Sequence, residues 1–351
     1  MSAAPQRRRT RAGSTDAGTH EGRRAAGLGA GLLLSALLLL LFGAAIGSTG
    51  FENPFASGQD AAALSIVRDI RLPRSLGAWL AGALLGLAGA VAQGLFRNPL
   101  ADPYLLGSAS GASLGVALAL WLLGAQAESV QWLVRLGLTG AAFVGAVLAV
   151  LLTLALARGV QQTLRLLLAG VIVGVVLGAL KDLLTIASPS ILQVLQGFSL
   201  GSTGLLGWSA CALMGVVALG CLLAAWALAP VLDGLALGEA TALSLGLPVG
   251  AMRAALVGVL ALATGAAVAQ TGLIAFVGLA APHLVRSTVK ARHAWLLPLS
   301  AAMGGLLLLA ADLLARWLVA PQELPVGVLT AVIGGSYLLW LMHRGRAGRG
   351  G

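Results

Sequence analysis

Charged residues are scarce in this chain of 351 residues. Asp, Glu, Lys and Arg make up 10% of it, whereas hydrophobic residues make up 58%. A soluble globular domain carries about 25% charged residues, so the composition excludes one. Long apolar runs separated by short polar gaps predict an all-α polytopic membrane protein.

The residues that usually carry chemistry are also few. Cys211 and Cys221 lie in one apolar run without CxxC or metal-ligand spacing, and we interpret them as buried small side chains. None of the four histidines belongs to an HExxH pattern, and neither of the two lysines ends a GxxxxGK[ST] loop. The sequence therefore predicts no catalytic residue, no metal site and no nucleotide site. If ATP drives the protein, another chain must bind the ATP.

About ten apolar runs are long enough to cross a membrane, which takes about 20 residues in a helix. They lie at 25–47, 75–96, 104–124, 134–157, 164–187, 205–229, 254–271, 273–290, 295–319 and 326–343. Residues 1–24 then form a basic, disordered tail, residues 25–343 a ten-helix domain, and residues 344–351 a second basic tail. An even number of spans places both termini on one side of the membrane.

Basic residues outnumber acidic ones by 22 to 12, which gives a net charge of +10. They concentrate in the two tails and in the gaps on the same side, not on one amphipathic face. The positive-inside rule explains this placement and assigns that side to the cytoplasm. Membrane lipid is therefore an expected partner of the chain. Nucleic acid is therefore not the expected partner.

Five arginines depart from this rule because the span count places them at the outer side. They are Arg68, Arg71, Arg74, Arg135 and Arg316. An acidic partner outside the membrane is one reason to keep arginine there. The alternative is that their long side chains extend to lipid headgroups.

A short sequence recurs five spans apart. Residues 89–93 read GAVAQ and residues 265–270 read GAAVAQ, and a proline break follows each copy, at Pro99 and Pro282. Copies five spans apart have opposite orientations, which is typical of the inverted repeats of transporters. Chance matching of Gly/Ala-rich helices is the alternative.

The largest cytoplasmic gap, residues 230–253, is predicted to dock a partner. Asp233-Gly234 indicates a turn, a short helix is expected near 239–245, and Gly246 to Pro248 indicate a stop. A pair of short amphipathic helices on the membrane surface fits this pattern. An ordinary linker is the alternative.

These features occur together in one known family. The chain resembles the FecCD-like permeases, the transmembrane subunits of type II ABC importers for iron-siderophores, haem and cobalamin. The resemblance covers roughly residues 60–343. It is carried by RLPR at 71–74, GAVAQGLFRNPLADPYLLG at 89–107, LRLLLAG at 164–170, LALGEATALSLGLP at 235–248, GLIAFVGLAAPHLVR at 272–286, ADLLAR at 311–316 and ELPVGVLTAVIG at 323–334.

The resemblance implies an assembly in the bacterial inner membrane. Two copies of the ten-helix permease pair with two cytoplasmic ABC ATPase subunits, which bind ATP and Mg, while this chain holds no cofactor. A periplasmic or lipid-anchored binding protein delivers the ligand and docks on Arg71, Arg74 and Arg316 through its carboxylates. Asp312, four residues before Arg316, is placed to hold that arginine.

Further residues take roles by the same resemblance. The ATPase-coupling element comprises Leu237, Gly238, Glu239, Ala240, Leu245, Gly246 and Leu247. The cytoplasmic gate comprises Thr163 and Leu164, although some relatives carry a small hydroxyl residue in place of Leu164. Gly170, Gly174 and Gly178 share one helix face and line the pathway or allow close helix contact.

Three more side chains lie near the expected path. Lys181 and Asp182 either contact the ligand or neutralise one another. His283, in a Pro-His pair, is interpreted as a helix-break histidine bonded to backbone in preference to a haem ligand.

The expected function is ATP-driven import of an iron complex, either a ferric siderophore or haem, by alternating access. Cobalamin import by the same machine is the alternative. A secondary transporter driven by ions is less favoured. It would need acidic residues in the middle of its helices, and this chain has few, with Asp312 as the main candidate. An intramembrane enzyme lacks a paired His/Asp/Glu constellation, and a scaffold has no need of the docking segment.

Overall fold

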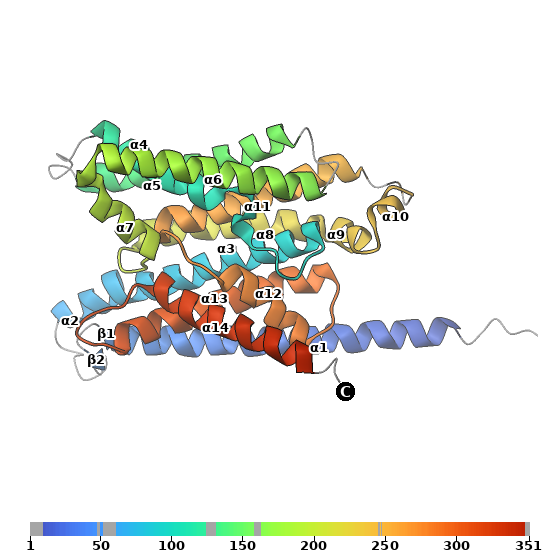
Figure 1. Cartoon of the computed structure of the whole chain (residues 1–351). Coiled ribbons are helices and arrows are strands. Elements are labelled where there is room, and N and C mark those ends of the chain that lie inside the picture. The colour runs from blue at the N-terminus through green and yellow to red at the C-terminus, as the bar shows by residue number, and fades with distance from the viewer. Residues whose placement is uncertain are drawn as a thin grey trace, which may run out of the picture.

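The computed structural model describes residues 10–47, 50–51, 61–123, 131–157, 163–244, 246 and 248–347. It is a bundle of long helices with shorter elements at both ends (Figure 1). In chain order the elements are α1 (Thr10–Ala45), β1 (Ile46–Gly47), β2 (Gly50–Phe51), α2 (Ala61–Ile66), the π-helical turn η1 (Val67–Arg71), α3 (Leu72–Phe96), the 3-10 turn η2 (Pro103–Leu106), α4 (Ser108–Leu123), α5 (Gln131–Leu156), α6 (Thr163–Ala187), the 3-10 turn η4 (Pro189–Ile191), α7 (Leu192–Leu200), α8 (Trp208–Ala227), α9 (Ala229–Ala236), α10 (Glu239–Ser244), α11 (Val249–Thr271), α12 (Val277–Thr288), α13 (His293–Trp317) and α14 (Val326–Ala347).

The predicted all-α membrane fold is confirmed. Helices α1, α3, α4, α5, α6, α8, α11, α12, α13 and α14 correspond in order to the ten predicted spans. Within the described residues, seven helices are long and apolar enough to cross a membrane, and Ser108–Leu122 and Val326–Leu341 are shorter apolar helices. The two short strands, η4 and α7 were not predicted.

Two predicted boundaries differ from the structure. Helix α1 begins at Thr10, so residues 10–24 of the predicted disordered tail are helical, and residues 1–9 lie outside the described part. Helix α12 has 12 residues, or about 18 Å at 1.5 Å per residue, which is shorter than the hydrocarbon core of a bilayer. The predicted span 273–290 is therefore wrong as one continuous helix. Residues 272–276 are not helical, and Phe276 has φ +67.

Helices α3 and α13 form an unusually close pair. A Cβ on Gly82 would lie 2.3 Å from the carbonyl oxygen of Gly304, and a Cβ on Gly86 would lie 2.2 Å from that of Ser300. Only glycine permits such an approach, as small residues do between membrane helices. Residue numbers rise along α3 as they fall along α13, so the pair is antiparallel and connects the two ends of the bundle.

The two copies of the repeated sequence lie in α3 and α11, and a helix interruption follows each. The interruptions meet, because the Tyr104 hydroxyl donates to the carbonyl oxygen of Ile274 at 3.1 Å. A Cβ on Gly278 would lie 2.6 Å from the ring of Pro103. Non-helical backbone is tolerated within a membrane protein where other protein covers it. The crossing of equivalent segments is the arrangement that an inverted repeat predicts.

The two ends of the bundle carry different elements. Helices α2 and α7 and both strands gather at one end, and α9 and α10 lie at the other (Figure 1). The N-terminal part of α1 projects past the bundle at the end with α9 and α10, and α14 runs toward the same end. For clarity, we name these the strand end and the coupling end.

Candidate functional site

The RLPR sequence begins at a break in the regular helix. Residues 64–96 form one apolar helical run, but Val67–Arg71 adopt a π-helical turn within it. Pro73 lacks a backbone N–H and cannot complete the α-helical hydrogen-bond ladder, which accounts for the wider turn. Such turns occur frequently at functional sites. Arg68 on this turn is exposed at the strand end.

Arg74 and Arg316 lie together around a fully buried carboxylate. Asp312 accepts hydrogen bonds from Arg74 Nε at 3.4 Å and Arg74 Nη2 at 3.3 Å, and from Arg316 Nη2 and the Thr203 hydroxyl. Arg74 also bonds to both carboxylate oxygens of Glu323, each at 2.9 Å. These residues, which we name the arginine cluster, join α3, α13 and the segments before α8 and α14.

Two of the three predicted docking arginines are buried. Arg316 is 1% exposed and Arg71 is 7% exposed. Arg71 donates to the carbonyl oxygen of Ala44 at 3.3 Å. The structure thus gives all three predicted docking arginines contacts within the chain, and their docking role stays a prediction. The sequence gives Arg68 no role, although it is more exposed than the three predicted docking arginines.

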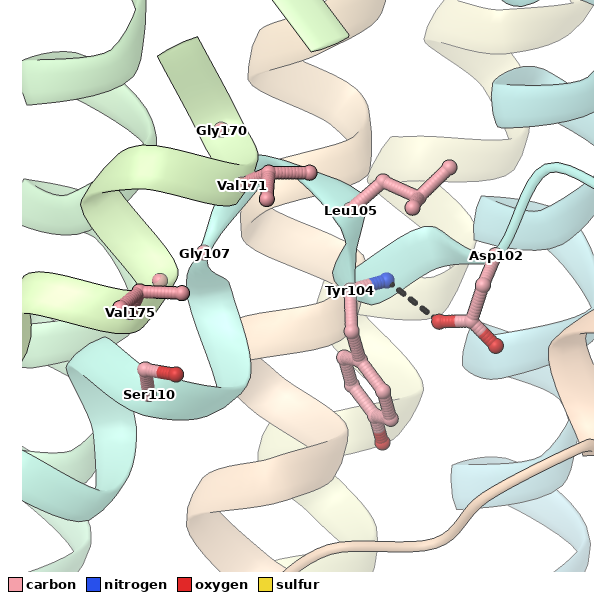
Figure 2. A pocket seen from close by; sticks show the side chains of 9 residues that line it. Asp102, Tyr104, Leu105, Gly107, Ser110, Gly170, Val171 and Val175 are labelled. Carbon is pink, nitrogen blue, oxygen red and sulfur yellow. Dashed lines mark hydrogen bonds between the residues drawn. The ribbon is translucent and has the colours of Figure 1, made fainter. Parts of the chain in front are cut away.

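A pocket of about 390 Å³ opens beside the first half of α6. Figure 2 shows α6 on one side of it and η2 with the start of α4 on the other. The Asp102 carboxylate accepts a hydrogen bond from the Tyr104 backbone N–H at 2.8 Å, which caps η2. The lining consists of Asp102, Tyr104, Leu105, Gly107, Ser110, Gly170, Val171, Gly174 and Val175.

The three predicted pathway glycines have different surroundings. A Cβ on Gly170 would lie 2.2 Å from the carbonyl oxygen of Leu105, so this glycine allows η2 to approach α6. Gly174 lines the pocket with ordinary contacts, and a Cβ on Gly178 would meet open space. Pathway lining stays a prediction for all three. Asp102 and Ser110 in the same pocket were missed because they lie in a different sequence block.

The other residues predicted near the path are also located. Thr163 begins α6 at the coupling end, and Leu164 is 68% exposed. Lys181 and Asp182 bond to one another at 2.7 Å. The interpretation of His283 as a helix-break residue is wrong, because it lies inside α12 and its ring packs edge-on against Tyr337 with centroids 6.0 Å apart.

Residues 230–253, which we name the coupling segment, contain most of the expected short helices, α9 and α10. Leu237 is 70% exposed and Leu243 is 56% exposed. Glu239 instead faces the protein, because its carboxylate lies 3.2 Å from Arg253 Nη2 on α11. Gly238 and Gly246 have positive φ values of 115 and 77 and make the turns on either side of α10. Leu245 and Leu247 lie outside the described residues.

Sequence reasoning missed a second contact of this segment. Asp233 of α9 accepts a hydrogen bond from the His293 backbone N–H at 3.1 Å, and the same oxygen lies 2.6 Å from His293 Nδ1. Asp233 had been interpreted only as a turn residue, and His293 carried no assignment. They are 60 residues apart in the sequence, so no local motif could pair them.

Comparisons with known proteins agree on the family. The family model of the FecCD transport family matches residues 31–344. The hemin transport system permease protein of Yersinia pestis is 41% identical over 332 residues, which cover 91% of this chain and 98% of that protein. The vitamin B12 import system permease protein of Salmonella typhi is 40% identical over 313 residues, 88% of this chain and 94% of that protein.

A solved structure gives the same result for the fold. A metal-chelate type ABC transporter in an inward-facing conformation matches with a TM-score of 0.81 and 29% identity. The match covers 91% of this chain and 99% of that one. The chain therefore belongs to the FecCD transport family, as a multi-pass permease of the ABC transporter type.

Proposed function

We propose that this chain is the permease subunit of an ATP-driven importer that moves an iron complex, haem or a ferric siderophore, across the bacterial inner membrane. The observation that carries the proposal is the match to a hemin permease over nearly the whole of both chains. The similarity to a metal-chelate type ABC transporter supports the same ligand class.

A separate subunit supplies the energy in this proposal. Two cytoplasmic ATPase subunits bind ATP and Mg, and this chain binds neither. The exposed apolar residues of the coupling segment support contact with such a subunit, because they would be covered in the assembly. The coupling end, with both termini, would then face the cytoplasm, as the positive-inside rule predicts.

The strand end would receive the binding protein. The bidentate contact of Arg74 with the Glu323 carboxylate supports the proposal that this site accepts a carboxylate. Arg68, which is exposed on the same helical run, extends the basic surface. The binding protein would select the ligand, and two copies of the permease would form the path between their α6 helices, with Gly174 and its pocket on that path.

The proposal is tested by reconstituting the permease in liposomes with its ATPase and binding protein. We expect ATP-dependent accumulation of haem or a ferric siderophore inside the liposomes, and none with an ATPase that cannot hydrolyse ATP. Accumulation driven by an ion gradient without the ATPase would contradict the proposal. Omission of the binding protein is the control for specific delivery.

Cobalamin is the second candidate ligand, because a vitamin B12 permease matches this chain almost as well. The same liposomes distinguish the two candidates when haem, ferric siderophores and cobalamin are offered separately. Accumulation of cobalamin alone would replace the iron complex while leaving the rest of the proposal in place.

A further inference from the structure

Helix α9 sits on the coupling end of the α3–α13 pair. Leu232 of α9 is fully buried and belongs to the main hydrophobic core. A Cβ on Gly94 of α3 would lie 3.1 Å from Leu232 and 3.0 Å from His293 Nε2. One turn of each of the three helices thus meets at a single point. The apolar contact of Leu232 holds α9 in place, but apolar packing alone does not fix its orientation.

Asp233 supplies the directional bond. The first N–H groups of a helix have no partner within it and carry partial positive charge, so a carboxylate there is stabilising. Asp233 fills this role for α13 from a different helix, and it also contacts the His293 ring. Glu21 of α1 accepts a bond from the adjacent Arg292 N–H at 2.9 Å. Of these carboxylates, only Asp233 belongs to the coupling segment.

The rest of α13 leads from this contact to the arginine cluster. The helix has 25 residues and is about 37 Å long. Its backbone lies against that of α3 at Gly82, Gly86 and Gly304 with no space for side chains between them. At the other end Asp312 binds Arg74 of α3. Contacts at both ends and backbone packing along its length therefore hold the pair together.

The two coupling helices are attached to different parts of the bundle. Helix α10 is connected to α11 through Glu239 and Arg253, whereas α9 is connected to α13 through Asp233 and His293. A hollow of about 680 Å³, lined by Trp226, Asp233 and Arg292 among others, leaves space beside α9 for a shift relative to α8. A displacement of the segment therefore reaches α13 through α9.

We propose that Asp233 is a positioning residue for coupling: it transmits movement of the ATPase-facing segment to the α3–α13 pair, and through that pair to the arginine cluster. This inference rests on the proposed function. It assigns the path of mechanical coupling to one named contact, Asp233 with His293, and it places the docking surface at the far end of the same helix pair.

The test compares substitutions at this contact in the complete transporter in liposomes. Asp233→Ala removes both acceptor oxygens, whereas Asp233→Asn keeps one that the His293 N–H can reach. We expect Asp233→Ala to lower the ligand imported per ATP hydrolysed by about tenfold, the order of magnitude for one charge-assisted hydrogen bond. Asp233→Asn should recover most of the ratio.

Two further variants make the result specific. His293→Ala should give the same loss, and its combination with Asp233→Ala should add little, because both remove one contact. Thr288→Ala is the matched control: Thr288 is exposed at the same end, and its hydroxyl bonds to Leu284 and Val285 within its own helix. It should behave as the unmodified protein does.

The outcomes separate the inference from the function on which it rests. An unchanged import-to-hydrolysis ratio in Asp233→Ala overturns the inference. So does a loss of import in Asp233→Ala that only follows a loss of assembled complex or of melting temperature. If the unmodified complex shows no import with its binding protein, the proposed function fails instead.

Discussion

Removal of the Asp312 carboxylate is the sharpest test of the arginine cluster. Asp312 is 0% exposed and holds two guanidinium groups. In Asp312→Ala, Arg74 keeps Glu323 as a partner, but Arg316 loses the one carboxylate that it contacts within the described residues and stays buried. Its remaining acceptor is the Ser75 hydroxyl at 3.3 Å, and its Nε is already without a bond. The damage is therefore that of one buried, uncompensated positive charge.

The magnitude follows from that assignment. Removing one partner of a buried ion pair costs about 3–5 kcal/mol. For a chain of this size we expect the melting temperature to fall by roughly 4–7 °C. Asp312→Ala combined with Arg316→Leu removes both charges, so the double variant should be more stable than the single one. Glu323→Gln is the control: that side chain is 32% exposed, and the change should cost about 1 kcal/mol or less.

The assay is thermal unfolding of the purified permease in one detergent at a fixed scan rate, because unfolding of such proteins is commonly irreversible. Tryptophan emission reports it directly, since the chain has eight tryptophans. A double variant no more stable than Asp312→Ala would refute the reasoning, because the cost would then not come from the unpaired Arg316. A shift below about 2 °C in the single variant would refute it as well.

Two other predictions concern packing and pH. Gly86→Ala places a Cβ 2.2 Å from the Ser300 carbonyl oxygen. This overpacking should cost about 1–3 kcal/mol and lower the melting temperature by a few degrees. Gly220→Ala, where nothing lies within 4 Å, is the matched control, and equal effects of the two variants would contradict close packing at Gly86. Burial raises the pKa of the Asp102 carboxyl above its usual range, against a smaller opposing effect of the Tyr104 N–H. The folded protein thus binds the Asp102 proton more tightly than the unfolded chain, and this contribution to stability is present at acid pH and lost as pH rises. Asp102→Asn keeps an acceptor for Tyr104, so it should raise the melting temperature at neutral pH, with a gain that shrinks toward pH 4 or so; a gain independent of pH would contradict this explanation.

Most of the helices could be predicted from the sequence because a bilayer imposes one simple constraint. An apolar run of about 20 residues has few alternatives to a helix, and nine of the predicted spans correspond to helices of similar position. The exception, 273–290, begins as an apolar run, but its second half carries Pro282, His283, Arg286 and Lys290. Its break depends on backbone contacts from distant elements, such as the Leu273 N–H bond to Phe198 at 3.0 Å. Composition carries no trace of these contacts.

The functional residues divide in the same way. The charge anomaly at Arg74 and Arg316 is local, and so is the four-residue spacing of Asp312 and Arg316, which the structure confirms as a contact. The contact between Arg74 and Asp312 joins residues 238 apart and required the fold. Accordingly, the sequence indicated the partner of Arg316 within the chain, but for Arg74 it placed the carboxylate partner in another protein. The structure supplies one within the chain.

This internal partner changes what docking would require. If a carboxylate of a binding protein is to contact Arg74, it must either compete with Glu323, which is one-third exposed, or add to it at the remaining exposed edge. Asp312 is too deeply buried to be displaced and would stay with Arg316. The exchangeable part of the cluster is therefore the Arg74–Glu323 bond at its surface, and the fixed part is the bond between α3 and α13. A docking event at the surface would thus act on the same helix pair that Asp233 contacts at the coupling end, which would give the two ends of the permease a common mechanical element.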